Sequence, residues 1–267
     1  MANRRRGSSD SNSEEVSKLH SLAQLAGISI STRTHRLMIL ITSNVWLTTD
    51  KGLKIVNLTE ADLKEALVLM RNSYYPDESV AKAVRLHDCP EAVDELEKLT
   101  IETFEDGSSL IAILDGKIVG AAFNKVQFKP KPGDQSYFED FRDFKCKTDT
   151  AKEYMDLMIR VDARNDAFEY YGVQKSLELM FLGVSRDHRG LRIGKSLAEA
   201  TCKLAKSRDI PLVNVIFSSN FSQAIGRALQ WDELCTIQMN EFSFKGRPYG
   251  DFTGEHQTLV AMGKKID

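Results

Sequence analysis

The 267-residue sequence has few cysteines, no long apolar run and almost no net charge, and each shortage excludes a class of protein. Its four cysteines lie far apart without a Cys-x-x-Cys pair, which fits neither a zinc site nor a disulfide scaffold. The longest uncharged run, residues 37–49, is shorter than the about 20 apolar residues that span a bilayer. The net charge of −2 provides no basic surface for nucleic acid. We therefore expect neither a membrane nor a nucleic acid as partner.

What remains is an ordinary globular composition, with 42% hydrophobic and 28% charged residues. Residues 1–50 are expected to be an N-terminal extension that is partly disordered, because 1–18 are polar and rich in serine. Within it, 19–25 fit a helical turn or two and 37–41 fit a strand. Residues 51–267 are expected to form one domain. No apolar segment follows the arginines at 4–6, so we expect no secretory signal and a cytoplasmic protein. Its thiols are expected to be reduced, and the protein is expected to be a monomer.

Residue periodicity predicts an α/β (α+β) domain around one sheet. The expected strands are 53–57, 109–114, 117–123, 177–184, 212–218, 234–242 and 257–262. The expected helices are 60–72, 91–99, 150–169, 193–207 and 221–229. Asp115-Gly116 is typical of a tight β-hairpin. Residues 128–148, which contain two prolines and several aromatic side chains, are expected to form a long loop.

The most informative segment, 180–197, runs from a strand through a turn at Gly190 into a helix. Free backbone N–H groups and the helix dipole at such a terminus form a site for pyrophosphate. Arg189, Arg192 and Lys195 can add charge-assisted hydrogen bonds. The spacing is that of neither a P-loop nor a Rossmann fingerprint. A plain strand, turn and helix with surface arginines would have the same residues, so this segment alone leaves both interpretations open.

This segment resembles the acyl-CoA signature of the GNAT superfamily of N-acetyltransferases, Arg/Gln-x-x-Gly-x-Gly/Ala, with Arg189 and Gly194 at its first and last positions. Arg192 replaces the first glycine, which is harmless if the backbone there is helical and otherwise weakens cofactor binding. Three further elements are similar to insect-type arylalkylamine N-acetyltransferases of the dopamine N-acetyltransferase kind. They are Tyr-Tyr-Pro-Asp-Glu-Ser at 74–79, Ser-Ser-x-aromatic-Ser at 218–222 and Gly-Glu-His-Gln at 254–257.

The resemblance covers residues 53–266 and implies the GNAT fold, a mixed and mostly antiparallel central sheet flanked by helices. It implies acetyl-CoA as co-substrate, bound at the strand–turn–helix, and no metal. The residues implied to bind acetyl-CoA are Leu182, Val184, Arg189, Gly190, Leu191, Arg192, Ile193, Gly194 and Lys195.

The same resemblance implies Glu78, Ser218 and Ser222 as catalytic residues. Glu78 matches the general base of the subfamily, which is needed because an alkylamine, with a pKa near about 10.4, is an ammonium ion at neutral pH. The two serines match a pair implicated in proton relay or in protonating the CoA thiolate, although Ser218 equally suits a helix N-cap. Tyr75 and His256 are expected to contact the amine, while core packing explains both residues as well.

The expected function is therefore acetyl-CoA-dependent N-acetylation of a small primary amine, an arylalkylamine such as dopamine, tyramine or serotonin. Transfer would be direct in a ternary complex, with Glu78 as base. Two alternatives stay open. One is an acetyltransferase for aliphatic amines such as agmatine or a polyamine. The other is a catalytically weak acyl-CoA-binding protein of the same fold, suggested by Ser79, Arg192 and Gln230 in place of the family's proline and glycines.

Overall fold

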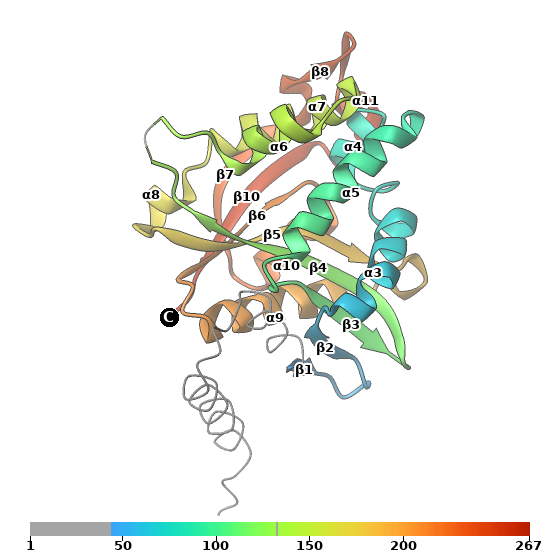
Figure 1. Cartoon of the computed structure of the whole chain (residues 1–267), viewed down its shortest axis with the longest axis vertical. Coiled ribbons are helices and arrows are strands. Elements are labelled where there is room, and N and C mark those ends of the chain that lie inside the picture. The colour runs from blue at the N-terminus through green and yellow to red at the C-terminus, as the bar shows by residue number, and fades with distance from the viewer. Residues whose placement is uncertain (1–43, 132) are drawn as a thin grey trace, which may run out of the picture. The chain divides into compact units, whose positions relative to one another are not determined.

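The computed structural model describes residues 44–131 and 133–267, and these form one central sheet with helices on both faces (Figure 1). The strand order of the eight-stranded sheet found in this part of the chain is β1-β2-β3-β4-β5-β6-β10-β7. Neighbouring strands are antiparallel except β5 and β6. Their bounds are β1 Val45–Thr48, β2 Lys54–Asn57, β3 Leu110–Leu114, β4 Lys117–Phe128, β5 Lys175–Val184, β6 Leu212–Phe217, β7 Asp232–Gln238 and β10 Thr258–Lys265. The mixed, mostly antiparallel sheet confirms the expected fold class.

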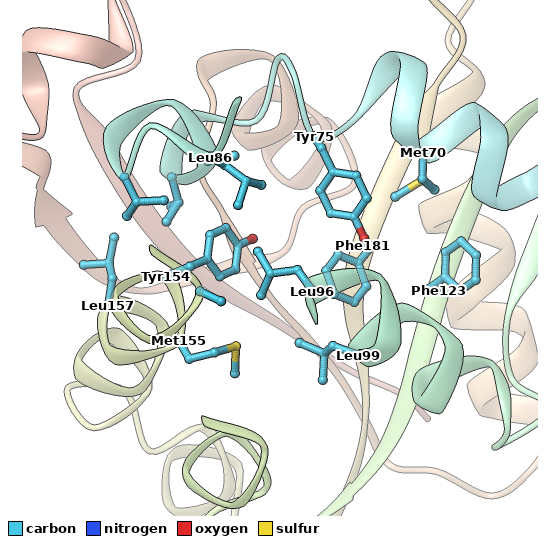
Figure 2. Packing of buried hydrophobic residues seen from close by; sticks show 14 of the residues in the cluster. Met70, Tyr75, Leu86, Leu96, Leu99, Phe123, Tyr154, Met155, Leu157 and Phe181 are labelled. Atoms are coloured by element: carbon cyan, nitrogen blue, oxygen red, sulfur yellow. The ribbon is translucent and has the colours of Figure 1, made fainter. Parts of the chain in front are cut away.

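Each face of the sheet has its own hydrophobic core. On one face lie α3 (Glu60–Ser73), α5 (Pro90–Phe104), α6 (Tyr137–Lys145) and α7 (Asp149–Asp162), and on the other lie α9 (Ile193–Ser207) and α10 (Asn220–Ala228). Figure 2 shows the first of these cores, in which Met70, Leu96 and Phe181 pack together. The smaller elements are α4 Ser79–Ala83, α8 Ala167–Tyr171, α11 Gly250–Thr253, β8 Ser243–Phe244 and β9 Arg247–Pro248. No helix of the described ranges combines the length and the apolar character needed to cross a membrane.

Local sequence rules explain the elements that were predicted best. The apolar positions of α9 recur every three or four residues, and Ile193, Leu197 and Leu204 are all buried. Burying each such side chain contributes roughly 1.5–3 kcal/mol. In the β3–β4 hairpin, Asp115 and Gly116 both have positive φ, as a type I′ turn requires.

Elements that depend on caps or distant contacts differ from the expectation. Residues 128–148 contain α6 rather than only a loop, because Ser136 and Glu139 form a capping box and Phe138 and Phe141 are buried on one side. The expected helix 150–169 is split into α7 and α8. The sheet begins with β1, so it extends N-terminal to the expected boundary at residue 51. The expectations for 19–25 and 37–41 lie outside the described residues.

The parallel pair β5 and β6 separates towards its C-terminal end. Pairing joins only Leu177 to Val213 and Glu178 to Asn214, although both strands continue beyond these residues. On its other side, β5 has one extra residue opposite β4, Met180, which is a β-bulge. The gap between the strands leaves backbone groups of β5 unpaired and sets the place of the site.

Candidate active site

A cavity of about 910 Å³ opens where β5 and β6 separate. It reaches from the α3–α4 turn to the N-terminal ends of α9 and α10. Most of the predicted site residues meet here. Those that line the cavity are Glu78, Leu182, Val184, Arg189, Gly190, Arg192, Ile193, Gly194, Lys195, Ser218, Ser222 and His256.

Glu78 is buried at the N-terminus of α4, with 9% of its surface exposed. Its Oε1 accepts hydrogen bonds from the Val80 N–H at 3.0 Å and from the Ser218 hydroxyl at 2.5 Å. Its Oε2 accepts one from the Ala81 N–H at 2.6 Å. Since a carboxylate oxygen has two lone pairs, Oε2 keeps one that can accept a proton within the cavity.

Burial raises the pKa of Glu78 above its usual value, because a charged carboxylate is poorly stabilised away from water. The hydrogen bonds from Ser218 and from the α4 backbone act in the opposite direction, and so does the charge of Lys82. A carboxylate with a raised pKa that still ionises is suited to act as a general base near neutral pH.

The two serines have different partners. The Ser218 hydroxyl donates to Glu78, whereas Ser222 exchanges hydrogen bonds with Ser219 in the capping box that begins α10. The N-cap is therefore Ser219 and not Ser218, and Ser218 is free of a capping role. Both predicted serines line the cavity, and Ser218 is the one in contact with Glu78.

Tyr75 does not reach the cavity, contrary to the expectation. The residue is 5% exposed, and its hydroxyl forms a hydrogen bond with Thr100 in the core. Figure 2 shows the ring of Tyr75 among the buried side chains. The preceding Tyr74 lines the cavity instead, and its ring packs edge-on against Tyr75 and Phe181. The turn after α3 points consecutive side chains in different directions, which the sequence pattern did not predict.

The turn between β5 and α9 provides a cradle for an anionic group. Gly190 has a φ of 80°, and a side chain added at Gly194 would meet Ile225 at 3.0 Å. Arg192 and Lys195 line the cavity and form no ion pair with any described residue. Leu191 is half exposed and lies outside the cavity lining. Unpaired cations and free N–H groups at the start of α9 fit the pyrophosphate of acetyl-CoA.

Asp77 joins the α3–α4 turn to this cradle. Its carboxylate accepts two hydrogen bonds from Arg186 and one from Arg189, and Arg189 also donates to the Ser73 carbonyl at 2.8 Å. The two guanidinium groups lower the pKa of Asp77 to about 2. Asp77 therefore stays ionised, and part of the hydrogen-bonding capacity of Arg189 is used within the protein. Sequence reasoning missed this contact, because its partners are more than 100 residues apart.

The three departures from the family pattern preserve the backbone that the pattern encodes. Arg192 and Gln230 have φ values of 63° and 56°, the left-handed region that normally favours glycine. Arginine at this position is expected to be harmless if the backbone is right-handed helical. The backbone at Arg192 is instead left-handed. Ser79 stands at the first helical position of α4, where proline is common because no N–H partner is needed.

Arg192→Gly is expected to raise the free energy of unfolding by about 0.5–1 kcal/mol, because relief of left-handed strain outweighs the entropy that glycine adds to the unfolded chain. It should also weaken acetyl-CoA binding about 3- to 10-fold at low salt, through loss of a charge-assisted bond. Urea unfolding and calorimetric titration measure the two effects. Arg192→Ala is the matched control, because it removes the charge and keeps the strain. Equal stability of the two variants would contradict the assignment of strain.

His256 lies at the rim of the cavity beside the start of α10. Its Nδ1 accepts a hydrogen bond from the Asn220 N–H at 3.3 Å, and its ring packs edge-on against Phe221. Phe221 is 69% exposed and also lines the cavity. The pair forms an aromatic wall, and the backbone contact orients the imidazole.

Comparison with known proteins agrees with the fold. A model described as the acetyltransferase (GNAT) family matches residues 70–225, more than half of the chain. Arylalkylamine N-acetyltransferase 2 from Aedes aegypti is 22% identical, with a TM-score of 0.71 over 80% of this chain and 99% of that chain. Putative arylalkylamine N-acetyltransferase 7 from the same mosquito is 20% identical, with a TM-score of 0.72 over 85% and 97%.

A third solved structure with the same fold has a different acceptor in its name. The polyamine N-acetyltransferase of Drosophila melanogaster, described as forming N-acetylagmatine, is 16% identical, with a TM-score of 0.67 over 80% of this chain and all of that chain. At these identities the likeness establishes the fold. Which acceptor binds depends on the side chains that line the cavity.

Proposed function

This chain belongs to the acetyltransferase (GNAT) family and is an N-acetyltransferase, and from that premise we propose that its acceptor is a small arylalkylamine such as dopamine, tyramine or serotonin. Acetyl-CoA is the acetyl donor used by the family. The observation that carries the proposal is the combination of an aromatic and apolar wall with a single carboxylate, that of Glu78, which is free of arginine partners.

The proposed reaction is direct transfer in a ternary complex. The pyrophosphate of acetyl-CoA binds at the start of α9, and the acetyl thioester lies in the gap between β5 and β6. Glu78 accepts a proton from the bound ammonium, and the free amine nitrogen attacks the thioester carbonyl carbon. Backbone N–H groups of β5 near Leu182–Val184 stabilise the oxyanion. The C–S bond then breaks, and the nitrogen releases its second proton to solvent. The departing thiolate takes a proton from water or from the Ser218 hydroxyl, which recovers one from the protonated Glu78.

The cavity favours an acceptor with one charge and an apolar body. Tyr74, Met180 and Ile216 give apolar or aromatic surface in the cavity that Glu78 lines. Among the described residues of the lining, the acidic side chains are Asp77 and Glu78, and Asp77 is held by two arginines. Agmatine or a polyamine would bring a second cation for which no free carboxylate is present in that lining. An aromatic ring, in contrast, gains stacking and edge contacts.

The test is release of CoA thiol from acetyl-CoA with tyramine, dopamine, serotonin, agmatine and spermidine as acceptors. We expect kcat/KM for the best aromatic amine to exceed that for agmatine and spermidine by at least about tenfold, as loss of one buried charge pairing would give. Turnover with only the aliphatic amines would retain the chemistry and overturn the aromatic acceptor. Acetyl-CoA binding without turnover of any amine would favour an acyl-CoA-binding protein.

A further inference from the structure

Lys82 is a charged residue of the cavity that the proposed chemistry does not use. It lies on α4 one helical turn after Glu78, and its backbone N–H donates to the Glu78 carbonyl at 3.0 Å. Its side chain is half-buried and lines the cavity. No described residue forms an ion pair with its ammonium group. An unpaired cation in a partly buried wall must act on whatever enters the cavity.

The carboxylates around Lys82 leave its ammonium group without an ion-pair partner among the described residues. Asp77 is neutralised by Arg186 and Arg189, and the carboxylate of Glu78 is held by Ser218 and the α4 backbone. The ammonium of Lys82 nevertheless acts on Glu78, since its charge lowers the pKa of that carboxyl. Lys82 therefore lies within electrostatic reach of the group that receives the proton of the amine.

We propose that Lys82 selects acceptors by repelling amines that carry a second positive charge. This inference rests on the proposed function and names the charge class of its substrates. Every amine brings one ammonium to Glu78, and that charge is lost before nitrogen attacks. A diamine keeps its second charge inside the cavity during the reaction, so the repulsion from Lys82 persists in the transition state. The penalty therefore falls on kcat/KM of the dication.

The experiment compares hexylamine with cadaverine, which have the same number of non-hydrogen atoms and differ by a terminal ammonium in place of a methyl group. The measured quantity is the kcat/KM for hexylamine divided by the kcat/KM for cadaverine. It is determined in the wild-type chain, in Lys82→Met and in Lys82→Glu. We expect the ratio to fall about tenfold in Lys82→Met, which corresponds to about 1.4 kcal/mol, and further in Lys82→Glu. A ratio is independent of the fraction of folded enzyme.

Lys206→Glu is the matched control for net charge. Lys206 is exposed in the last turn of α9, thirteen residues and therefore about 20 Å along the helix from its start. This variant is expected to keep the wild-type ratio. A similar fall in Lys206→Glu would show that bulk charge sets the preference and would overturn the role of Lys82.

Two further outcomes also decide the question. An unchanged ratio in both Lys82 variants, with or without weaker acetyl-CoA binding, would overturn the proposal, and weaker binding would assign Lys82 to the CoA phosphates. Calorimetric binding of the two amines to the CoA-bound protein gives the same comparison without turnover. If wild type acetylates no amine, the proposed function fails, while the binding ratio still tests Lys82.

Discussion

Replacing Glu78 by glutamine is expected to lower kcat/KM for the best amine by about 10²–10⁴-fold, the usual contribution of a positioned general base. Glutamine fills the same space and keeps an oxygen for one of the two α4 N–H groups, but it cannot accept a proton from ammonium. The cradle at the start of α9 is formed by other residues, so the Kd for acetyl-CoA should change by less than about twofold. Steady-state kinetics and calorimetry measure the two quantities.

The pH profile distinguishes a base from a merely structural carboxylate. The pKa of Glu78 is raised by burial, so activity should rise with pH through a value above that of an ordinary glutamate. The variant should lose this acidic limb. The groups that face Glu78 are the Ser218 hydroxyl, the Lys82 ammonium, and the hydroxyls of Tyr74 and Tyr154.

The matched control is Glu65→Gln, at an exposed position of α3 outside the cavity. It should retain the rate and the pH profile of wild type. Because Glu78 also caps α4, the variants Glu78→Asp and Ser218→Ala should be measured alongside. Retention of wild-type kcat/KM in Glu78→Gln with an unchanged acidic limb would remove Glu78 from the proposed reaction.

Glu178→Gln is expected to stabilise the protein by roughly 2–4 kcal/mol at pH 8.5 and to have little effect near pH 4. Glu178 lies on β5 with 6% of its surface exposed, and burial together with the nearby Asp162 carboxylate raises its pKa to about 8. The folded protein therefore holds this proton up to about pH 8, whereas the unfolded chain releases it near the ordinary value of 4.5.

Between those two pH values the folded state binds more protons than the unfolded state, so the free energy of unfolding falls as pH rises. A glutamine removes this dependence. The glutamine amide can also donate to Asn214 on β6, which pairs with position 178. The buried Oδ1 of Asn214 has no hydrogen-bond partner among the described residues. Gln127 donates to Glu178 at 2.9 Å, and the charge of Lys125 favours ionisation.

Urea unfolding at pH 4.5, 6.5 and 8.5 measures the effect. Glu65→Gln serves again as control, because its exposed side chain should leave the pH dependence of wild type intact. A wild-type slope that persists in Glu178→Gln would show that other groups carry the pH dependence.

Short-range patterns predicted much of the fold. The bounds of α9 and the β3–β4 hairpin follow from spacing and from Asp115-Gly116, since each depends on neighbouring residues. The same reasoning missed α6, although its Ser-x-x-Glu capping box is present in the sequence at 136–139. There the two prolines and clustered aromatic residues favoured a loop, and burial of Phe138 and Phe141 favoured the helix instead.

For the site, the sequence by itself determined the strand, turn and helix around Gly190, and the family resemblance named Glu78, Ser218 and the acetyl-CoA segment as candidates. Only the tertiary structure placed the Ser218 hydroxyl on Glu78, 140 positions away, and turned Tyr74 rather than Tyr75 into the cavity. The physical reason is that a motif encodes backbone conformation over a few residues. Which side chains meet is decided by strand register and helix packing, which depend on the whole chain.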